Sequence, residues 1–241
     1  MRHNNKEFIK YDKRGAYHWE QISNHPIKSN AYVKARYDKC INLLKLKYSC
    51  ELEGKLGLDM GCGDGVLTYF MWKNGIIATG IDNSDIAIKL AIEKHGYFNT
   101  NCKFIVGDSC NTREDSETYD IVLCSDVIEH VYDPNKLLKE IKRLLKPHGH
   151  AIISTPIKLT KNPIDSMHII EWYREGFSEL IGNIFECHEI FISHPLVWME
   201  IMNRAIIPRM LINLMAPIYN VFNGNEKRWR YCTLQFAVVK K

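Results

Sequence analysis

Residues 56–65 read LGLDMGCGDG, and this ten-residue stretch decides the fold. A short apolar run contains the acid Asp59, and three glycines follow at every second position, at Gly61, Gly63 and Gly65. Glycine has no Cβ, so the backbone can turn sharply there and approach a ligand closely. A helical pattern of apolar residues follows directly. The stretch therefore predicts a strand, a tight loop and a helix, which is where an open α/β sheet binds its ligand.

Around this stretch, short apolar runs alternate with helical patterns over residues 55–156, which indicates βα units and a parallel sheet. The runs are nearly continuous in apolar character, as expected for strands that helices cover on both faces. The expected strands are Lys55–Met60, Ile76–Asp82, Lys103–Asp108, Tyr119–Ser125 and His150–Thr155. The expected helices are Val66–Lys73, Asp85–His95 and Pro134–Leu145, the last capped by Asp133 and ended by Lys146-Pro147-His148-Gly149.

The flanking segments complete a single domain of 241 residues. We expect a helix over Asn30–Tyr48, a helix over Trp172–Ile181, and strands over Phe185–Ser193 and Tyr231–Val239. The domain is expected to comprise a helical cap (1–50), a core (55–193), an apolar helical insertion or lid (194–224) and a final strand (231–240).

The composition is that of an ordinary globular protein, with 46% apolar and 25% charged residues. A net charge of +4 is too small for a dedicated nucleic-acid binder, so we do not expect a nucleic-acid partner. Eight cysteines form no CxxC pair, and the first fourteen residues lack an apolar signal-peptide core. No run of 18 apolar residues occurs. We expect a cytoplasmic protein, with membrane association as an alternative.

The glycine loop has two candidate ligands. A dinucleotide loop reads G-x-G-x-x-G, but the sixth position here is Val66, and a pyrophosphate would be repelled by Asp59. That acid suits a ligand with an ammonium group, while the start of the next helix offers free N–H groups to a carboxylate. An amino acid such as the methionine moiety of a cofactor supplies both groups. The loop alone leaves a purely structural glycine turn open.

Further acids stand at the ends of the next strands. Asp82, at the end of the second strand, can bind both hydroxyls of a ribose, as acids do in related folds. Asp108, after the third strand, can accept a hydrogen bond from an adenine amino group. An amino acid joined to adenosine fits this set. The predicted cofactor-binding residues are Asp59, Gly61, Cys62, Gly63, Gly65, Asp82, Asn83, Asp108, Ser109 and Ser125.

These motifs resemble the class I S-adenosylmethionine-dependent methyltransferases. The resemblance covers about residues 55–182 and includes the glycine loop, Gly80-Ile81-Asp82, Gly107-Asp108, Asp126-Val127-Ile128-Glu129-His130 and Leu145-Lys146-Pro147-His148-Gly149. It implies S-adenosyl-L-methionine as methyl donor and S-adenosylhomocysteine as product. It also implies a Rossmann-like α/β fold with a seven-stranded, mostly parallel sheet, helices on both faces and an antiparallel last strand. By the same resemblance, Arg36 approaches the cofactor carboxylate.

Methyl transfer from a sulfonium is an in-line displacement, in which the protein mainly aligns donor and acceptor. An oxygen acceptor also benefits from a general base. The candidates are His130, which follows the fourth strand, and His168 together with Glu171. Structural roles stay open beside these: Glu129 and His130 can shape the loop, and His168 can cap or pack against the following helix.

A second interpretation uses overlapping residues. Asp126, Glu129, His130 and His168 resemble the metal ligands of small-RNA 3′-terminal 2′-O-methyltransferases, and mixed oxygen and nitrogen ligands suit a divalent ion. This chain departs from that pattern, because its first acid is Asp rather than Glu and its histidine cluster is reduced to His168. A metal-dependent RNA 2′-O-methyltransferase is therefore the alternative function.

The two ends of the chain bear on the acceptor. Tyr11, Tyr17, His18 and Trp19 can close over an acceptor or pack against the sheet. The Met-rich, basic segment over 194–230 can form a lid, touch a membrane surface, grip a lipid-like acceptor or form a homodimer contact. We expect O-methylation of a small molecule, a glycan or a lipid-linked intermediate. A cofactor-binding scaffold without activity is the non-enzyme alternative, although the loop retains every acid and glycine.

Overall fold

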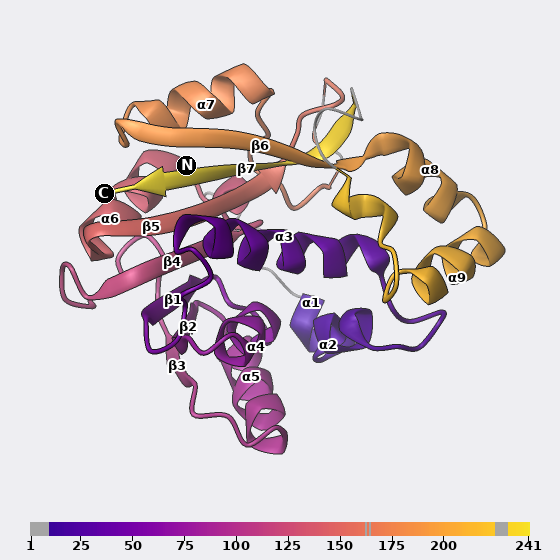
Figure 1. The fold of residues 1–241 in the computed structure, drawn as a ribbon, viewed down its shortest axis with the longest axis horizontal. Coiled ribbons are helices and arrows are strands. Elements are labelled where there is room, and N and C mark those ends of the chain that lie inside the picture. The colour runs from indigo at the N-terminus through magenta and orange to yellow at the C-terminus, as the bar shows by residue number, and fades with distance from the viewer. Residues whose placement is uncertain (1–9, 162, 164, 225–230) are drawn as a thin grey trace, which may run out of the picture.

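The computed structural model describes residues 10–161, 163, 165–224 and 231–241 (Figure 1). The α-helices are α1 (Lys10–Arg14), α2 (Tyr17–Ile22), α3 (Ala31–Lys47), α4 (Val66–Lys73), α5 (Asp85–Tyr97), α6 (Pro134–Leu144), α7 (Arg174–Gly182), α8 (Leu196–Arg204) and α9 (Ile206–Met215). The strands are β1 (Leu56–Met60), β2 (Ile77–Asp82), β3 (Lys103–Val106), β4 (Tyr119–Ser125), β5 (Leu145–Pro156), β6 (Cys187–Pro195) and β7 (Cys232–Lys240). Short 3₁₀ helices cover Ile128–His130 and Val221–Asn223.

The seven strands form one sheet in the order β3-β2-β1-β4-β5-β7-β6 (Figure 1). Strands β1 to β5 pair in parallel, whereas β7 runs antiparallel to both of its neighbours, β5 and β6. The expected α/β fold with an antiparallel last strand is confirmed. The strand order reverses between β1 and β4, so the loops that leave these two strands diverge. A crevice opens at that point of a doubly wound sheet.

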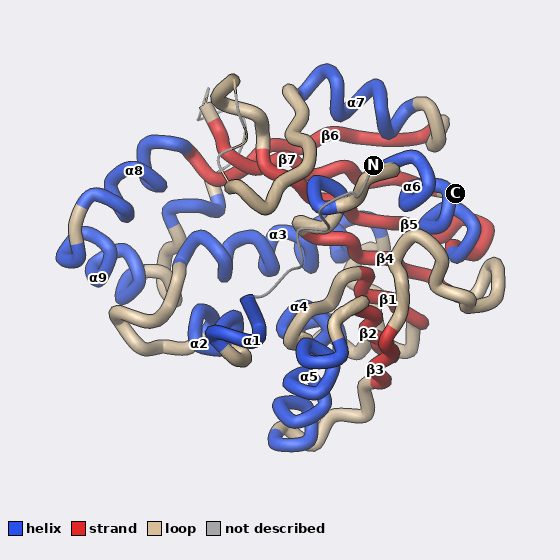
Figure 2. Tube along the Cα trace, turned by 180° about the vertical axis from the view of Figure 1, so that it is seen from behind, coloured by secondary structure: helices blue, strands red, loops and turns tan. Residues whose placement is uncertain are grey.

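Alternate side chains of the central strands point to opposite layers. On β4, Ile121 and Leu123 join a buried cluster with α3 and α4, whereas Val122 and Cys124 join another with α6 and α7. Figure 2 shows the sheet between these helices. A strand covered on both faces needs apolar residues at every position, which explains the unbroken apolar runs of the sequence.

Among the described α-helices, α3, α5 and α6 begin at side-chain caps. The Asn30 side chain accepts a hydrogen bond from the backbone N–H of Tyr32 at 3.1 Å, at the start of α3. The carboxylate of Asp133 accepts one from the N–H of Lys136 at 3.0 Å, and Pro134 occupies the first position of α6. The expected Asp133 cap is confirmed. Such caps satisfy N–H groups that the first helical turn leaves without an intrahelical partner.

Strand β5 begins five residues earlier than the sequence indicates, at Leu145. Leu145 pairs with Tyr119, and the register then shifts so that His150 pairs with Ile121. The residues between them bulge out of the pairing, with His148 at a φ of 66°. The segment that was expected to end a helix outside the sheet is therefore an irregular entry into the strand.

Other boundaries move by one to two residues. Strand β3 ends at Val106, because Asp108 already bridges back to Asn111. Helix α7 begins at Arg174, because Trp172 bridges Ile157 in an extended conformation. Strand β6 covers Cys187–Pro195 instead of Phe185–Ser193.

Helices α8 and α9 occupy the segment expected to be an apolar helical insertion. The side chain of Asn213 on α9 fixes it to the start of α3: its amide donates to the carbonyl of Ser29 at 2.6 Å, and its oxygen accepts from the N–H of Ala31 at 2.9 Å. Met202 and Phe222 pack beside the same turn. Among the described residues, no helix has the length and apolar character needed to cross a membrane.

Candidate active site

A cavity of about 1220 Å³ opens at the carboxyl ends of β1, β2 and β4. The N-terminal segment and residues 165–169 complete its wall. The predicted cofactor residues that line it are Arg36, Asp59, Gly61, Cys62, Asp82, Asn83, Asp108, Ser109 and Ser125. Gly63 and Gly65 are not among its lining residues; they shape the loop from behind. None of the described residues of 194–224 lines the cavity, so the lid over it stays a prediction.

The loop requires glycine for two reasons: its backbone angles and the lack of space for a Cβ atom. Gly61, Gly63 and Gly65 all have positive φ angles, of 71°, 54° and 83°. A Cβ on Gly61 would lie 2.4 Å from Cγ2 of Val127, and one on Gly63 would lie 1.9 Å from the hydroxyl of Tyr11. Both distances are far below van der Waals contact. The loop therefore brings its backbone close to the rest of the chain as well as to the cavity.

Asp59 is almost completely buried at the end of β1. One of its carboxylate oxygens accepts a hydrogen bond from the hydroxyl of Thr68 at 2.7 Å. Burial disfavours the charged form and raises the pKa of Asp59 to about 7. An ammonium group in the cavity would stabilise the ionised form, because it would compensate the buried charge. The residue thus matches the ligand that the sequence predicts for it.

Asp82 is held by two backbone donors at the end of β2. The N–H of Gly63 donates to one carboxylate oxygen and the N–H of Ser84 donates to the other, both at 2.9 Å. Burial raises the pKa of Asp82, and the two hydrogen bonds oppose that effect. Each oxygen retains acceptor capacity, so the fixed carboxylate can still accept from two neighbouring hydroxyls.

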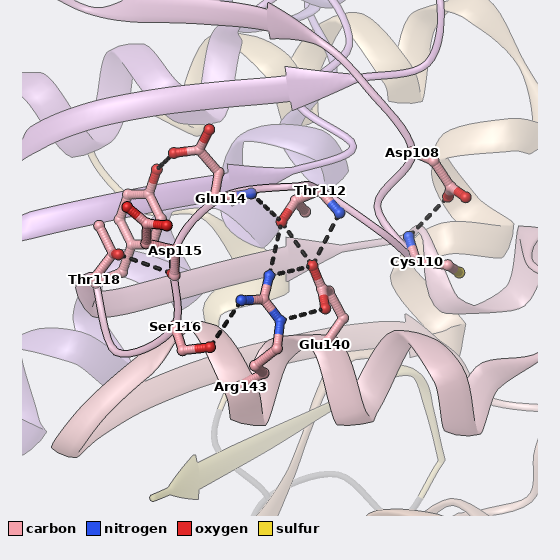
Figure 3. Close-up of polar contacts among 10 residues, drawn as sticks. Asp108, Cys110, Thr112, Glu114, Asp115, Ser116, Thr118, Glu140 and Arg143 are labelled. Atoms are coloured by element: carbon pink, nitrogen blue, oxygen red, sulfur yellow. Dashed lines mark hydrogen bonds and ion pairs between the residues drawn. The ribbon is translucent and has the colours of Figure 1, made fainter.

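Asp108 begins a loop that a charged network holds in place (Figure 3). Its carboxylate accepts from the N–H of Cys110 at 2.8 Å. Further along, Arg143 donates to both carboxylate oxygens of Glu140, each at 2.8 Å, and Thr112 donates to Glu140 through its N–H and its hydroxyl. The Arg143 guanidinium lowers the pKa of Glu140 to about 2. Helix α6 therefore anchors the loop that presents Asp108.

Arg36 and Asp126 form an ion pair across the cavity wall. Asp126 also accepts a hydrogen bond from the hydroxyl of Ser154 at 3.0 Å, and that hydroxyl lies 2.9 Å from Ser125 Oγ. The Nε atom of Arg36 is buried and has no hydrogen-bond partner among the described residues. A buried guanidinium with an unused N–H fits an additional anion, such as the carboxylate that the resemblance implies.

The histidines expected to act in catalysis meet at one side of the cavity. Nδ1 of His130 lies 3.1 Å from the carbonyl oxygen of Met167, and Nδ1 of His168 lies 2.6 Å from a carboxylate oxygen of Glu171. A carbonyl or carboxylate oxygen can only accept, so each Nδ1 donates and Nε2 is the basic nitrogen of the neutral ring. The two rings lie 5.0 Å apart, centre to centre. The structure thus brings His130, His168 and Glu171 together.

Glu129 is a third side chain, beside His130 and His168, that could bind a metal ion. Ligand atoms of Glu129, His130 and His168 lie within 4.8 Å of one another. Glu129 is fully buried, which raises the pKa of its carboxyl well above the ordinary range. Within the part of the chain that the structure describes, its Oε1 atom has no hydrogen-bond partner. These three donors fit a divalent ion. Asp126, the fourth residue of the alternative metal set, is paired with Arg36 instead.

The N-terminal segment closes one side of the loop through Asp64, which the sequence analysis did not single out. The buried carboxylate of Asp64 accepts a hydrogen bond from the backbone N–H of His18 and also lies 3.0 Å from Nδ1 of the His18 ring. The backbone carbonyl of Asp64 accepts a hydrogen bond from the indole N–H of Trp19 at 2.6 Å. Tyr11 and Tyr17 are buried and also line the cavity. The segment both packs and contributes to the wall. An acid inside the glycine loop was the sequence signal that could have indicated this.

Comparisons with known proteins agree with this geometry. A methyltransferase domain family matches residues 58–153. The ubiquinone biosynthesis O-methyltransferase of Vibrio parahaemolyticus is 31% identical over 206 residues, which cover 83% of this chain and 85% of the relative. The ubiquinone biosynthesis O-methyltransferase of Coxiella burnetii is 36% identical over 118 residues. This match covers 48% of this chain and 50% of the relative's length.

Among solved structures, a Haemonchus contortus phosphoethanolamine N-methyltransferase in complex with S-adenosyl-L-methionine superposes with a TM-score of 0.67. It is 17% identical, and the match covers 97% of this chain and 59% of that one. At this identity the likeness shows the fold alone. The domain match and the similarity to the Vibrio enzyme together show the family. The chain belongs to the class I S-adenosylmethionine-dependent methyltransferases.

Proposed function

We propose that this protein transfers the methyl group of S-adenosylmethionine to a hydroxyl oxygen of a small molecule, with His168 as the general base. The observation that carries the proposal is the hydrogen bond between His168 and Glu171 at the cavity. A carboxylate that holds Nδ1 leaves Nε2 to take a proton and stabilises the cation that forms.

The cofactor would lie along the carboxyl edge of the sheet. Asp59 would bind its ammonium group, Arg36 its carboxylate, Asp82 its ribose and Asp108 its adenine amino group. When bound, S-adenosylmethionine supplies a methyl carbon on a positively charged sulfur, and S-adenosylhomocysteine remains after transfer. The chain's own part is to align the acceptor and to remove the hydroxyl proton.

Oxygen as the methylated atom is supported by the relatives, which are named ubiquinone biosynthesis O-methyltransferases. The cavity also has room for an acceptor beside the cofactor, since at about 1220 Å³ it exceeds the size of most single-ligand pockets. The further expectations of a glycan, a lipid-like acceptor or a homodimer stay predictions.

The test is transfer of a labelled methyl group to a panel of soluble phenols and alcohols. His168→Ala should lower kcat by roughly 10²–10⁴-fold, the usual contribution of a general base, and leave S-adenosylmethionine affinity unchanged. Glu171→Gln should cause a smaller loss. His188→Ala, on β6 and outside the cavity lining, is the matched control and should keep full activity. Wild-type turnover in the His168→Ala protein would contradict the assignment.

Metal-assisted transfer is the second candidate, favoured by the grouping of Glu129, His130 and His168. A divalent ion held there would polarise the acceptor oxygen. Metal-assisted transfer predicts that a chelator abolishes activity and that added magnesium restores it. It also predicts that Glu129→Gln loses activity. Labelling of RNA ends under these conditions would favour the RNA alternative, whereas chelator-insensitive turnover would exclude both. A protein that binds the cofactor but methylates nothing in any panel would be the scaffold.

A further inference from the structure

The end of the glycine loop is held by two aromatic rings. The backbone carbonyl of Asp64 accepts a hydrogen bond from the indole N–H of Trp19 at 2.6 Å. The next carbonyl along the chain, that of Gly65, lies 2.9 Å from Nε2 of His95. Trp19 lies on α2, and His95 lies near the end of α5. Two segments that are far apart in the sequence therefore bind consecutive peptide groups of the loop.

The hydrogen bonds of His95 define which ring nitrogen carries the proton. A carbonyl oxygen can only accept, so Nε2 of His95 donates to Gly65. Nδ1 of the neutral ring is then an acceptor, and it lies 2.7 Å from the hydroxyl oxygen of Thr100, which can donate to it. The ring is buried, which lowers the pKa of His95 and favours the neutral form. Thr100 thus keeps the His95 donor directed at the loop.

The two rings also pack against each other. The planes of Trp19 and His95 are nearly perpendicular, at 83°, with 5.8 Å between the ring centres. Phe98 stacks on the Trp19 ring at 5.1 Å. A Cβ on Gly65 would lie 3.0 Å from Nε2 of His95, so the loop passes directly against this ring. Packing as well as hydrogen bonding therefore sets the positions of the two donors.

Holding these carbonyls fixes what the loop presents to a ligand. A peptide bond is planar and trans, so its N–H points opposite to its carbonyl. The hydrogen bond to the Gly65 carbonyl therefore also directs the N–H of Val66, the first residue of α4. The first N–H groups of a helix have no partner within the helix, and they are the groups that bind a ligand carboxylate.

We propose that Trp19 and His95 are positioning residues for the cofactor, because they hold the glycine loop in the conformation that binds S-adenosylmethionine. This role rests on the proposed placement of the cofactor along the carboxyl edge of the sheet. Neither ring is among the residues that line the cavity, so each acts through a carbonyl of the loop.

Loss of the His95 donor should loosen the loop without unfolding the protein. The Gly65 carbonyl also accepts a hydrogen bond from the N–H of Tyr69 at 3.0 Å, at the first turn of α4. The carbonyl therefore keeps one partner when His95 is replaced, and the helix can persist. What is lost is the second hydrogen bond, which connects the loop to α5.

The experiment is calorimetric titration of S-adenosylhomocysteine into the folded wild-type and variant proteins. His95→Phe keeps an aromatic ring but removes the donor, so it should weaken binding by about three- to tenfold. His95→Gln should recover most of the affinity, because the glutamine amide can donate to the Gly65 carbonyl. Trp19→Phe, which removes the indole N–H, should weaken binding by a factor similar to that of His95→Phe.

Phe98→Leu is the matched control, because Phe98 packs on Trp19 but makes neither hydrogen bond to the loop. It should lower the melting temperature and leave the affinity unchanged. The double variant of Trp19→Phe and His95→Phe should weaken binding by less than the product of the two separate factors, because both residues act on one loop conformation.

Wild-type affinity in His95→Phe and Trp19→Phe would overturn the proposal, as would an equal loss of affinity in Phe98→Leu. Failure of His95→Gln to bind more tightly than His95→Phe would also contradict it. If His95→Phe does not fold, Trp19→Phe decides in the same way.

Asp82→Ala separates this inference from the placement of the cofactor. If Asp82→Ala weakens binding but the ring variants do not, the cofactor lies at the sheet edge and only the role of the two rings is wrong. If Asp82→Ala binds as tightly as wild type, both the placement and the role of the rings are wrong.

Discussion

At the scale of single residues, Asp59 shows how a site is prepared at a cost in stability. Its pKa of about 7 lies above the 3.8 of an exposed aspartate, because the folded protein buries it. The folded state therefore holds a proton that the unfolded chain releases. The stability that this proton contributes is fully present below pH 3.8 and is lost as the pH rises through 7.

Replacement of Asp59 by Asn should stabilise the protein while it destroys the site. At pH 8 we expect the variant to be more stable than wild type by on the order of 2–4 kcal/mol, because no charge is buried. The difference should narrow as the pH falls to 5. Urea unfolding at both values checks this, and calorimetry should show at least tenfold weaker binding of S-adenosylmethionine. Unchanged affinity would remove Asp59 from the cofactor site.

The pH dependence of cofactor binding follows from the same group. Only ionised Asp59 can pair with an ammonium group, so affinity should rise by about eightfold between pH 6 and 7.5, across a pKa of about 7. Asp59→Asn should flatten this dependence. Calorimetric titrations at a series of pH values give the slope, and a wild-type affinity that is constant over this range would contradict the interpretation.

The positions of three acids in the site could be predicted from the sequence, because each stands at the end of an apolar run that is recognisable as a strand. Asp59, Asp82 and Asp108 all line the cavity for this reason. The roles of Asp64 and Glu129 could not be predicted from the ends of apolar runs. Their roles depend on His18 and Thr155, which lie 46 and 26 residues away in sequence, so only the folded chain brings these partners together.

At the scale of elements, the glycine loop should be intolerant of even one methyl group. Gly61→Ala combines a left-handed backbone with a contact of 2.4 Å to Val127, so we expect a loss of about 2–4 kcal/mol and weaker cofactor binding. Val127→Ala in the same chain should recover part of the loss, since it removes the methyl groups that clash. Urea unfolding measures both.

Gly96→Ala is the control for this series. Gly96 lies inside α5 with an ordinary φ, and no atom of the described residues would lie within 4 Å of an added Cβ. Alanine favours a helix over glycine by roughly 0.5–1 kcal/mol, so this variant should be more stable than wild type. If Gly61→Ala and Gly96→Ala have the same effect, the loop geometry is not as described.

The loop after β3 should depend on the pair of Arg143 and Glu140. Arg143→Ala removes the main charge partner of Glu140 and should cost about 1–3 kcal/mol at pH 7. The pair lowers the pKa of Glu140 from 4.5 to about 2, so its contribution is present above pH 4.5 and is lost as the pH falls through 2. Urea unfolding of wild type and variant should therefore converge near pH 2. A gap that persists there would assign the loss to packing.

Element types were easier to predict than their ends. The strands around the glycine loop follow from apolar runs, and α4 matches its expected range, because local patterns determine them. The early start of β5 depends on the pairing of Leu145 with Tyr119, which is a tertiary contact. Residues 194–224 were expected to be helical and apolar, but the rotation of α9 depends on Asn213, whose partners come from the other end of the chain.

At the scale of the whole molecule, the sheet order gathers the ends of β1, β2 and β4 around one cavity. Segments from both sides of the core close it: the N-terminal segment beside the glycine loop, and residues 165–169, which include His168, beside His130. We propose that the cofactor binds on the side of the cavity that presents carboxylates and backbone amides, and that the acceptor binds on the side that presents His130 and His168. This division of one cavity is the central claim.

A crystal structure of the protein with S-adenosylhomocysteine tests that claim most directly. We expect the ribose hydroxyls within hydrogen-bond distance of Asp82, the amino acid end at the glycine loop beside Arg36, and the sulfur facing His130 and His168. A nucleoside bound elsewhere, or a sulfur that points away from both histidines, would contradict the account.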